Sequence, residues 1–351
     1  MVKLDVDSHK LMYHPERVSE WYRKGDCYPI YVEIGLTNRC NHRCIFCALD
    51  YLEHGGFDIK KEIILNALKE MAEGGVKSVM FAGEGEALLH KDVSEIVKKA
   101  KEYGLDISIT TNGVFMDKKK ADEIFPLLSW IRFSLDAATP ETYSKLHGTK
   151  PDDFNKVIGN IKYLVSLKKS KNLNTTIGVQ FLLLSENVNE VIEAAKIVKE
   201  AGADNIQIKP YSHHPSSKND FSVDYLKLEW IEEELKKLED KNFQVNFRKK
   251  TMQRLQEGAT YDECYGLPFF ALIDARGNII PCNIFYNQPE FTYGNLNEKS
   301  FKEIWQSENR KQIIKKIKKR EIDVCRHGCR LDSINRYLHR LKNPDFHDNF
   351  I

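Results

Sequence analysis

Short apolar runs alternate with helix-length amphipathic segments through the first two thirds of the chain. Six runs have the length of buried strands, and we expect strands at residues 31–36, 78–82, 106–110, 131–135, 177–184 and 205–208. The segments between them carry apolar residues at helical spacing, which predicts helices at 60–73, 93–103, 118–128, 154–168 and 188–201. Strands that alternate with helices predict an α/β fold of parallel βαβ units, in a barrel or an open sheet.

The hydrophobic pattern changes on both sides of this alternating region. The first 28 residues are polar and show no regular period, so we expect an irregular extension there. Near the other end, the runs 269–273 and 279–280 flank a turn with Gly277, which predicts a β-hairpin in a small α+β domain. The predicted parts are therefore an extension at 1–28, the alternating domain at 29–240 and a C-terminal domain at 241–351.

The composition is that of an ordinary globular protein, with 42% hydrophobic and 30% charged residues among 351. The formal net charge of +2 gives no general attraction to nucleic acid or to acidic membranes. No apolar run approaches the ~20 residues needed to cross a bilayer, and the N-terminus lacks a signal-peptide core. We therefore expect a cytoplasmic protein, whose eight cysteines are better explained as metal ligands than as disulfides.

Chemically distinctive residues follow four of the predicted strands at the point where each ends. Three cysteines follow the first strand, residues 83–86 follow the second, 111–113 follow the third, and Ser134 and Asp136 close the fourth. In parallel barrels the residues at the carboxyl ends of the strands share one rim, where active sites are built. The sequence thus predicts a site at this rim.

Cys40, Cys44 and Cys47 have the spacing C-x3-C-x2-C directly after the first predicted strand. Thiolates suit both iron–sulfur clusters and zinc, but structural zinc sites usually require four ligands in two close pairs. Three thiolates on a four-iron cube would leave one iron open for chemistry. A zinc site or buried structural cysteines are the alternative explanation.

The segment CNHRCIFC, residues 40–47, resembles the signature of the radical S-adenosylmethionine (radical SAM) superfamily. The resemblance covers roughly residues 30–210 and implies a partial (β/α)6 TIM-like barrel. It implies that the open iron binds S-adenosylmethionine, whose reductive cleavage yields a 5′-deoxyadenosyl radical that abstracts hydrogen from a substrate. It further implies an external electron donor, such as flavodoxin or ferredoxin.

The resemblance also implies contacts to S-adenosylmethionine. Gly85 and Glu86 resemble the end of the family's Gly-Gly-Glu-Pro motif, although Glu84 and Ala87 replace its first and last residues. A carboxylate suits the methionine ammonium through a charge-assisted hydrogen bond, and we favour Glu86 over Glu84 for this contact. The other implied contacts are Phe46, Asn112, Ser134, Asp136 and Gln180.

Cys264, Cys282, Cys325 and Cys329 form a second set in the C-terminal region. Their spacing resembles the auxiliary-cluster extension called twitch, the shortened form of the SPASM domain. The resemblance implies a second, fully ligated [4Fe–4S] cluster for electron transfer or structural support. A zinc site is the alternative, because zinc also takes four cysteines.

Members with one such auxiliary cluster resemble an aminocyclitol dehydrogenase, so we expect oxidation of a small polar, sugar-like substrate, or a related epimerisation or dehydration. A nucleotide-sugar phosphate would suit Lys209, at the end of the sixth predicted strand. The alternatives are a peptide-modifying maturase or epimerase, and a non-enzymatic cluster-binding scaffold. For the pair His213 and His214, a position in a solvated loop is as well supported as a role toward the substrate. The expected substrate-facing residues are Tyr51, His54, Arg132, Lys209, Tyr211, His213 and His214.

Overall fold

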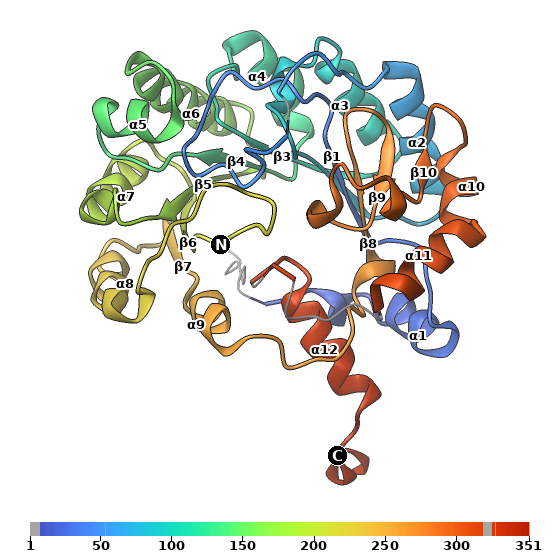
Figure 1. The fold of residues 1–351 in the computed structure, drawn as a ribbon. Coiled ribbons are helices and arrows are strands. Elements are labelled where there is room, and N and C mark those ends of the chain that lie inside the picture. Colours follow the sequence, from blue (N-terminus) through green and yellow to red (C-terminus); the bar gives the residue numbers. More distant parts are fainter. Residues whose placement is uncertain (1–7, 53, 319–324, 327, 351) are drawn as a thin grey trace.

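The computed structural model describes residues 8–52, 54–318, 325–326 and 328–350. Within these residues one ten-stranded sheet runs in the order β10-β9-β8-β1-β2-β3-β4-β5-β6-β7. All neighbours from β8 through β1 to β7 are parallel, and β9 and β10 are antiparallel additions. The sheet is curved but not closed, and helices surround its outer side (Figure 1).

The strands follow the predicted rhythm within a few residues. They are β1 Tyr31–Ile34, β2 Ser78–Phe81, β3 Asp106–Thr111, β4 Trp130–Ser134, β5 Thr176–Leu183, β6 Asn205–Pro210, β7 Gln244–Phe247, β8 Phe270–Ile273, β9 Asn278–Ile280 and β10 Gly294–Asn295. The longer helices are α1 Pro15–Lys24, α2 Lys61–Glu73, α3 Val93–Glu102, α4 Lys118–Ile124, α5 Pro140–His147, α6 Asp152–Ser170, α7 Val191–Glu200, α8 Glu229–Lys236, α9 Lys249–Glu257, α10 Phe301–Gln306, α11 Glu308–Lys318 and α12 Asp332–Lys342. The predicted parallel α/β unit and the hairpin of β8 and β9 are therefore confirmed.

Two helices differ from the prediction. The expectation of irregular structure before residue 28 was wrong over α1, which starts with Pro15, ends at Gly25 in the left-handed conformation and buries Trp21 completely. Helix α5 was not predicted, because it is short and lies between a strand end and a longer helix. Its C-terminal end becomes important at the functional site.

The sheet continues through the C-terminal region. Strand β7 pairs with β6, and β8 pairs with β1 over four residues from Tyr31 with Phe270 to Ile34 with Ile273. The predicted domain boundary near residue 240 therefore does not interrupt the sheet. Strands from beyond this residue extend the sheet on both sides, β7 next to β6 and β8 next to β1. The hairpin that follows Cys264 is hydrogen-bonded to the strand that precedes the first cysteines.

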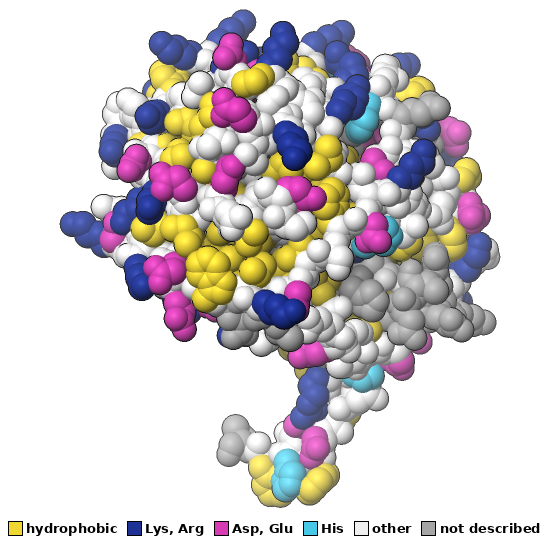
Figure 2. Space-filling view, turned by 60° about the vertical axis from the view of Figure 1, so that its left-hand side comes forward, with side chains coloured by type: hydrophobic (Ala, Val, Ile, Leu, Met, Phe, Trp, Pro, Cys, Tyr) yellow, Lys and Arg dark blue, Asp and Glu magenta, His cyan; other side chains and the backbone are white. Residues whose placement is uncertain are grey.

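The N-terminal segment is fastened to the C-terminal region beside α10. The Trp305 indole N–H donates to the carbonyl oxygen of Cys27 at 3.0 Å, and the fully buried Arg310 makes two hydrogen bonds to Asp26. Leu338 of α12 is buried against the first helix, whereas Phe346 and Phe350 beyond it are 77% and 80% exposed. The C-terminal end projects from the body of the molecule (Figures 1 and 2).

The molecular surface agrees with the small net charge. On the face seen in Figure 2, basic and acidic side chains are intermixed rather than gathered into one patch. Among the described residues, no helix is both long and apolar enough to cross a membrane.

Candidate radical SAM active site

The first cysteine loop (residues 37–50) follows β1 and is held at its start by a very close backbone approach. A Cβ atom on Gly85 would lie 2.3 Å from the carbonyl oxygen of Thr37 and 2.6 Å from that of Arg39. The Glu86 N–H donates to the same Arg39 oxygen at 2.9 Å. Only glycine permits this approach, so Gly85 shapes the entrance of the loop.

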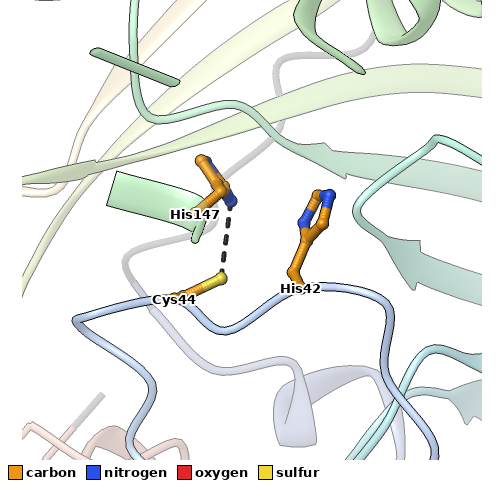
Figure 3. Close-up of side chains that lie close together, drawn as sticks. All are labelled: His42, Cys44 and His147. Atoms are coloured by element: carbon orange, nitrogen blue, oxygen red, sulfur yellow. Dashed lines mark hydrogen bonds between the residues drawn. The ribbon is translucent and has the colours of Figure 1, made fainter. Parts of the chain in front are cut away.

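The C-terminal end of α5 holds the middle of the first cysteine loop. Backbone N–H groups of Arg43 and Ile45 donate to the carbonyl oxygens of His147 and Leu146 at 3.0 and 2.9 Å. Gly148 has φ of 56°, and a Cβ there would lie 2.2 Å from the Arg43 oxygen. The His147 ring turns toward the loop, with Nδ1 3.5 Å from Cys44 Sγ (Figure 3). A left-handed glycine thus closes the helix directly against the cysteines.

The three thiols of the loop are suited to a metal cluster. Burial raises the pKa of Cys40 to about 11 and raises the pKa of Cys44 well above its ordinary value. The charges of Cys47 and Cys40 add to the shift at Cys44, because the sulfurs face one another. The thiols are therefore protonated until metal ions displace the protons.

The spacing of the sulfurs fits a cluster better than a single zinc ion. Two thiolates on one tetrahedral zinc lie about 3.8 Å apart, given a Zn–S distance of about 2.3 Å. In the part of the chain that the structure describes, His42, Cys44 and His147 are the only three possible ligands within 4.8 Å of one another. Neither set of cysteines is gathered tightly enough for one zinc, whereas a cube spreads its ligands farther apart.

Glu86 is buried next to the loop, and its carboxylate is largely engaged. Oε1 accepts from the Thr111 hydroxyl at 2.7 Å and from the Leu88 N–H at 3.1 Å, and Oε2 accepts from the Asn112 N–H at 2.8 Å. The Asn112 side chain donates to Asn41 of the first cysteine loop at 2.8 Å. Glu86 and Asn112 therefore join the ends of β2 and β3 to the loop, which leaves a contact to S-adenosylmethionine as a prediction for both.

The remaining predicted cofactor contacts gather at the ends of β4 and β5. Ser134 is the register partner of Gln180, and both are partly exposed at the rim. Asp136 is buried, and its carboxylate accepts from the Leu182 N–H at 2.5 Å and lies 3.2 Å from Nε2 of His147. Phe46 packs edge-to-face against the same His147 ring at 5.3 Å. Asp136 thus orients His147, and its contact to the cofactor remains a prediction.

The second cysteine set (Cys264, Cys282, Cys325 and Cys329) converges from three separate segments of the C-terminal region. Burial raises the pKa of Cys282 well above its ordinary value, and the charges of the other three cysteines contribute to the shift. Burial likewise raises the pKa of Cys329 to about 12. Asn335 of α12 lies with Nδ2 3.5 Å from Cys264 Sγ. The described cysteines form no disulfide, so four thiols are available at this place.

The structure separates the two adjacent histidines that were predicted to face the substrate. His213 is exposed, with Nδ1 3.1 Å from the Asn219 carbonyl oxygen. His214 is fully buried, its Nδ1 accepts from the Ser216 N–H, and its Nε2 lies 3.1 Å from the Asn283 oxygen. The Tyr51 ring stacks on His214 at 5.0 Å. Because Nδ1 accepts a hydrogen bond, Nε2 carries the ring proton, and His214 connects Tyr51, directly after the first cysteine loop, to the segment after Cys282.

Two further predicted residues are engaged in loop contacts. Tyr211 is buried and donates its hydroxyl to the Asn219 carbonyl oxygen at 2.7 Å. His54 lies with Nδ1 3.3 Å from the Asn38 carbonyl oxygen. Both help to fold the rim, and a role toward the substrate remains a prediction.

Positive side chains gather inside the curved sheet: Arg132 lies on β4 and Lys209 on β6, and Arg330 contacts Glu33 and Tyr31 of β1. Burial lowers the pKa of Lys209 to about 7, and four arginines add to the shift. Burial and neighbouring arginines also lower the pKa of Arg132 to about 10. We call this group the inner cationic wall, and its members are Arg132, Lys209, Arg248, Arg326 and Arg330.

The inner cationic wall has little negative charge against it. Glu33 forms an ion pair with Arg330, whose side chain remains 43% exposed, so water reaches this interior space. Arg326 is held by the hydroxyl and the carbonyl oxygen of Ser212 at 2.9 and 2.8 Å. Neither Lys209 nor Arg132 forms an ion pair with any described residue. The charge of Arg326 also acts on the pKa of Cys47 and of Cys329, so this arginine lies near both cysteine sets.

Sequence reasoning missed His147, Gly148 and the three arginines that follow residue 240. A histidine and a glycine at a helix end are a visible stop signal, but nothing local predicts which loop they meet. Arg326 and Arg330 each come directly after a cysteine of the second set. This adjacency could have indicated that positive side chains lie beside the predicted cluster.

Comparison with known families agrees with this geometry. A family model for the radical SAM superfamily matches residues 34–198, and a model for an iron–sulfur cluster-binding domain matches residues 264–330. The chain therefore carries a radical SAM domain followed by an iron–sulfur cluster-binding domain. Its two domains imply a [4Fe–4S] cluster that binds S-adenosylmethionine and an auxiliary iron–sulfur cluster. That the first cysteine loop and the second cysteine set hold these clusters remains a prediction.

Two curated relatives share one enzyme name, probable GTP 3′,8-cyclase. The chain is 29% identical to a probable GTP 3′,8-cyclase of Methanocaldococcus jannaschii over 230 residues, which cover 65% of this chain and 73% of the relative. It is 36% identical to a probable GTP 3′,8-cyclase of Saccharolobus solfataricus over 172 residues, which cover 46% of this chain and 54% of the relative. The chain thus spans about half the length of this second relative.

Solved structures of radical SAM proteins share the fold. Streptococcus suis SuiB bound to S-adenosylmethionine matches with a TM-score of 0.66 and 19% identity over 85% of this chain and 70% of SuiB. The enzyme anSMEcpe with bound AdoMet matches with a TM-score of 0.57 and 18% identity over 87% of this chain and 91% of anSMEcpe. BtrN in complex with AdoMet and 2-DOIA matches with a TM-score of 0.50 and 15% identity over 86% of this chain and 94% of BtrN.

Proposed function

We propose that this radical SAM enzyme acts on a small polar substrate that carries a phosphate, such as a nucleotide or a nucleotide sugar. The bound cofactors supply a 5′-deoxyadenosyl radical, which removes hydrogen from a carbon of the substrate. We propose that the net reaction is a dehydrogenation or a related epimerisation or dehydration, with the auxiliary cluster as an electron relay. The observation that carries the substrate class is the inner cationic wall.

The wall requires a negative ligand for electrostatic reasons. Lys209 and Arg132 share this part of the molecule with three arginines, and no described carboxylate forms an ion pair with either of the two. Enclosed charges of one sign raise the free energy of the protein unless a ligand of the opposite sign binds. A phosphate or diphosphate meets this need, and arginine side chains bind its oxygens in bidentate geometry.

The names of the relatives support a nucleotide substrate. Two sequence relatives are probable GTP 3′,8-cyclases, and GTP carries three phosphates. Because these relatives are named cyclases, a radical rearrangement of the substrate is an alternative to its net oxidation. BtrN binds the small molecule 2-DOIA, which agrees with the size of substrate proposed here.

A peptide substrate is the second candidate, because SuiB has been solved bound to the precursor peptide SuiA with a TM-score of 0.66 to this chain. The similarity is at 19% identity and supports the fold alone. A peptide without acidic groups would leave the inner cationic wall uncompensated, which favours the phosphate-bearing substrate.

The proposal is tested with anaerobically reconstituted, reduced enzyme and S-adenosylmethionine. We expect GTP or one of several nucleotide sugars (UDP-glucose, UDP-glucuronate, dTDP-glucose, GDP-mannose) to accelerate release of 5′-deoxyadenosine, whereas free glucose should not. Arg132→Gln should raise the KM for that compound about tenfold, equivalent to about 1.4 kcal/mol, and the exposed-site control Arg23→Gln should not. Equal stimulation by phosphate-free sugars, or by peptides alone, would contradict the substrate class.

A further inference from the structure

Glu84 is a carboxylate at the rim to which no role has been given so far. It occupies the position where the family motif has a small residue. Its Oε1 accepts from the Ala275 N–H at 2.6 Å, just beyond the end of β8. The same oxygen lies 3.6 Å from the position that a Cβ on Gly35 would occupy, just beyond β1. The carboxylate is therefore fixed over the ends of β1, β2 and β8. No described residue donates to its second oxygen, Oε2.

The surroundings of Glu84 favour a carboxyl group that exchanges a proton near neutral pH. Burial raises the pKa of Glu84 to about 7; Asp274 adds to this increase, and Arg276 opposes it. Arg276 is turned away over the ring of Phe57, at 4.2 Å. General acids and bases work best when their pKa lies near the working pH.

Tyr286 supplies a second polar group beside the carboxylate. Its hydroxyl lies 3.1 Å from the position of a Cβ on Gly83 and is buried without a described hydrogen-bond partner. Burial raises the pKa of Tyr286 well above its ordinary value, and the charge of Glu84 is the next largest cause. The hydroxyl therefore stays protonated and can donate a hydrogen bond. The charge of Glu84 also makes a small contribution to the raised pKa of Tyr51, which burial dominates.

Other candidate bases at the rim are already occupied. The Glu86 carboxylate accepts three hydrogen bonds, and both ring nitrogens of His214 are engaged. Lys209 belongs to the inner cationic wall on the side of β6. Glu84 lies instead over the ends of β1, β2 and β8, and the wall residue that reaches β1 is Arg330, which forms an ion pair with Glu33.

We propose that Glu84 is the proton acceptor for the substrate hydroxyl, and that Tyr286 donates a hydrogen bond to the same oxygen. This inference rests on the proposed function, in its dehydrogenation form. The anionic end of the substrate lies against the inner cationic wall, which directs its hydroxyl-bearing carbon toward Glu84. A tyrosine donor and a carboxylate acceptor suit one oxygen that changes from hydroxyl to carbonyl.

The step balances in atoms and electrons. The C–H bond of the substrate breaks, and its hydrogen atom forms the new C–H bond of 5′-deoxyadenosine. The O–H bond on the same carbon breaks, its proton passes to Glu84, and the C=O bond forms. The remaining electron passes to a one-electron acceptor, an oxidised iron–sulfur centre held by the second cysteine set. The substrate thus loses two protons and two electrons in total.

The test uses Glu84→Gln in the holoenzyme with the four nucleotide sugars named above, each deuterated in its sugar ring. We expect deuterium transfer into 5′-deoxyadenosine to stay within about twofold of the wild type, because hydrogen abstraction precedes proton loss. Formation of the carbonyl product, trapped as an oxime and measured by mass spectrometry, should fall about 100-fold or more. The control Glu298→Gln, at an exposed position, should leave both unchanged.

Unchanged product formation in Glu84→Gln, or loss of deuterium transfer together with product, would overturn the assignment. If no wild-type reaction transfers deuterium, the proposed function fails, and Glu84 is then judged by infrared titration of the same holoenzyme. A protonated carboxyl band that titrates near pH 7 in the wild type and is missing in Glu84→Gln then supports Glu84 as a proton-exchanging group only, and the hydroxyl of the proposed substrate is rejected as its partner. A spectrum without such a band rejects that role too.

Discussion

The Nδ1 atom of His147 lies 3.5 Å from the sulfur of Cys44, while its Nε2 atom lies 3.2 Å from Oδ2 of Asp136. The ring also stacks on Tyr143 at 4.2 Å, so packing and polar contacts hold it in one orientation. Cys44, a predicted cluster ligand, is thus connected through one imidazole to the end of β4. Groups that contact metal ligands in this way tune both affinity and redox potential.

His147→Phe should weaken the first cluster, because Cys44 loses its polar partner while the aromatic packing is kept. We expect reductive cleavage of S-adenosylmethionine to slow about 10- to 100-fold. The midpoint potential of the first cluster, measured by an electron paramagnetic resonance titration, should become more negative, since the thiolate no longer receives a hydrogen bond. His90→Gln is the control, because the buried His90 contacts the Ile59 carbonyl oxygen and no cysteine. An unchanged potential in His147→Phe would contradict this role.

Gly85→Ala should disrupt the entrance of the first cysteine loop, because a methyl group would collide with two backbone oxygens. We expect the free energy of unfolding to fall by about 1–3 kcal/mol and iron at the first site to be lost. Gly159→Ala is the matched control, since no atom lies within 4 Å of a Cβ at this helical position. It should stabilise the protein by about 0.5–1 kcal/mol in urea denaturation. Full iron content in Gly85→Ala would be the contrary result.

Cys282→Ala should separate the two clusters in function. Iron should fall from about eight to about four atoms per chain, because one fully ligated cube is lost. Release of 5′-deoxyadenosine should persist, and formation of an oxidised product should stop. Cys27→Ala is the control, since the buried Cys27 sulfur lies 3.7 Å from the Pro268 carbonyl oxygen, away from both sets. Zinc in place of iron at the second set would overturn the electron relay.

Binding of the phosphate-bearing substrate should take up a proton at alkaline pH. The pKa of Lys209 is lowered to about 7, so its side chain is mostly neutral at pH 8 and charged at pH 6. An anion bound beside it raises this pKa again. Calorimetry of UDP-glucose binding in buffers of different ionisation heat should therefore detect uptake of about one proton at pH 8 and almost none at pH 6.

Lys209→Met should abolish that uptake, and Lys241→Met, at an exposed position, should not. Proton uptake that is equal at both pH values, or that survives in Lys209→Met, would assign the titration to another group.

Arg310→Ala should destabilise the protein without touching either cysteine set. The fully buried guanidinium forms two hydrogen bonds to Asp26 and lies 3.9 Å from the centre of the Trp305 ring. Because the Asp26 side chain is 38% exposed, loss of these charge-assisted hydrogen bonds should lower the free energy of unfolding, measured in urea, by about 1–3 kcal/mol. The exposed pair of Arg340 and Asp348 is the control, and Arg340→Ala should cost about 0–1 kcal/mol.

The parallel βαβ rhythm could be predicted because buried strands and amphipathic helices leave a strong periodic signal. Helix α5 could not, because only three of its eight residues are buried and its stop signal, Gly148, has its effect on a distant loop. The pairing of β8 with β1 joins residues more than two hundred positions apart, as Tyr31 with Phe270, and no local pattern encodes it.

The candidate site likewise combines local features, which the sequence predicts, with long-range features, which it does not. The cysteines and the rim residues were predictable, since ligand spacing and strand ends are local features. The different positions of His213 and His214 were not, because adjacent residues in a loop can face solvent or the interior. Arg132 and Lys209 were expected singly, but their meeting with arginines from beyond residue 240 depends on the curvature of the whole sheet.

The pairing of β8 with β1 has a consequence for any shortened form of this protein. Strand β1 is hydrogen-bonded on both sides, to β2 and to β8. A chain that stopped before β8 would leave the row of N–H and C=O groups on one side of β1 without partners. Open strand edges of this kind template association with other chains. Removal of the C-terminal region should therefore yield a self-associating barrel rather than a simpler monomeric enzyme.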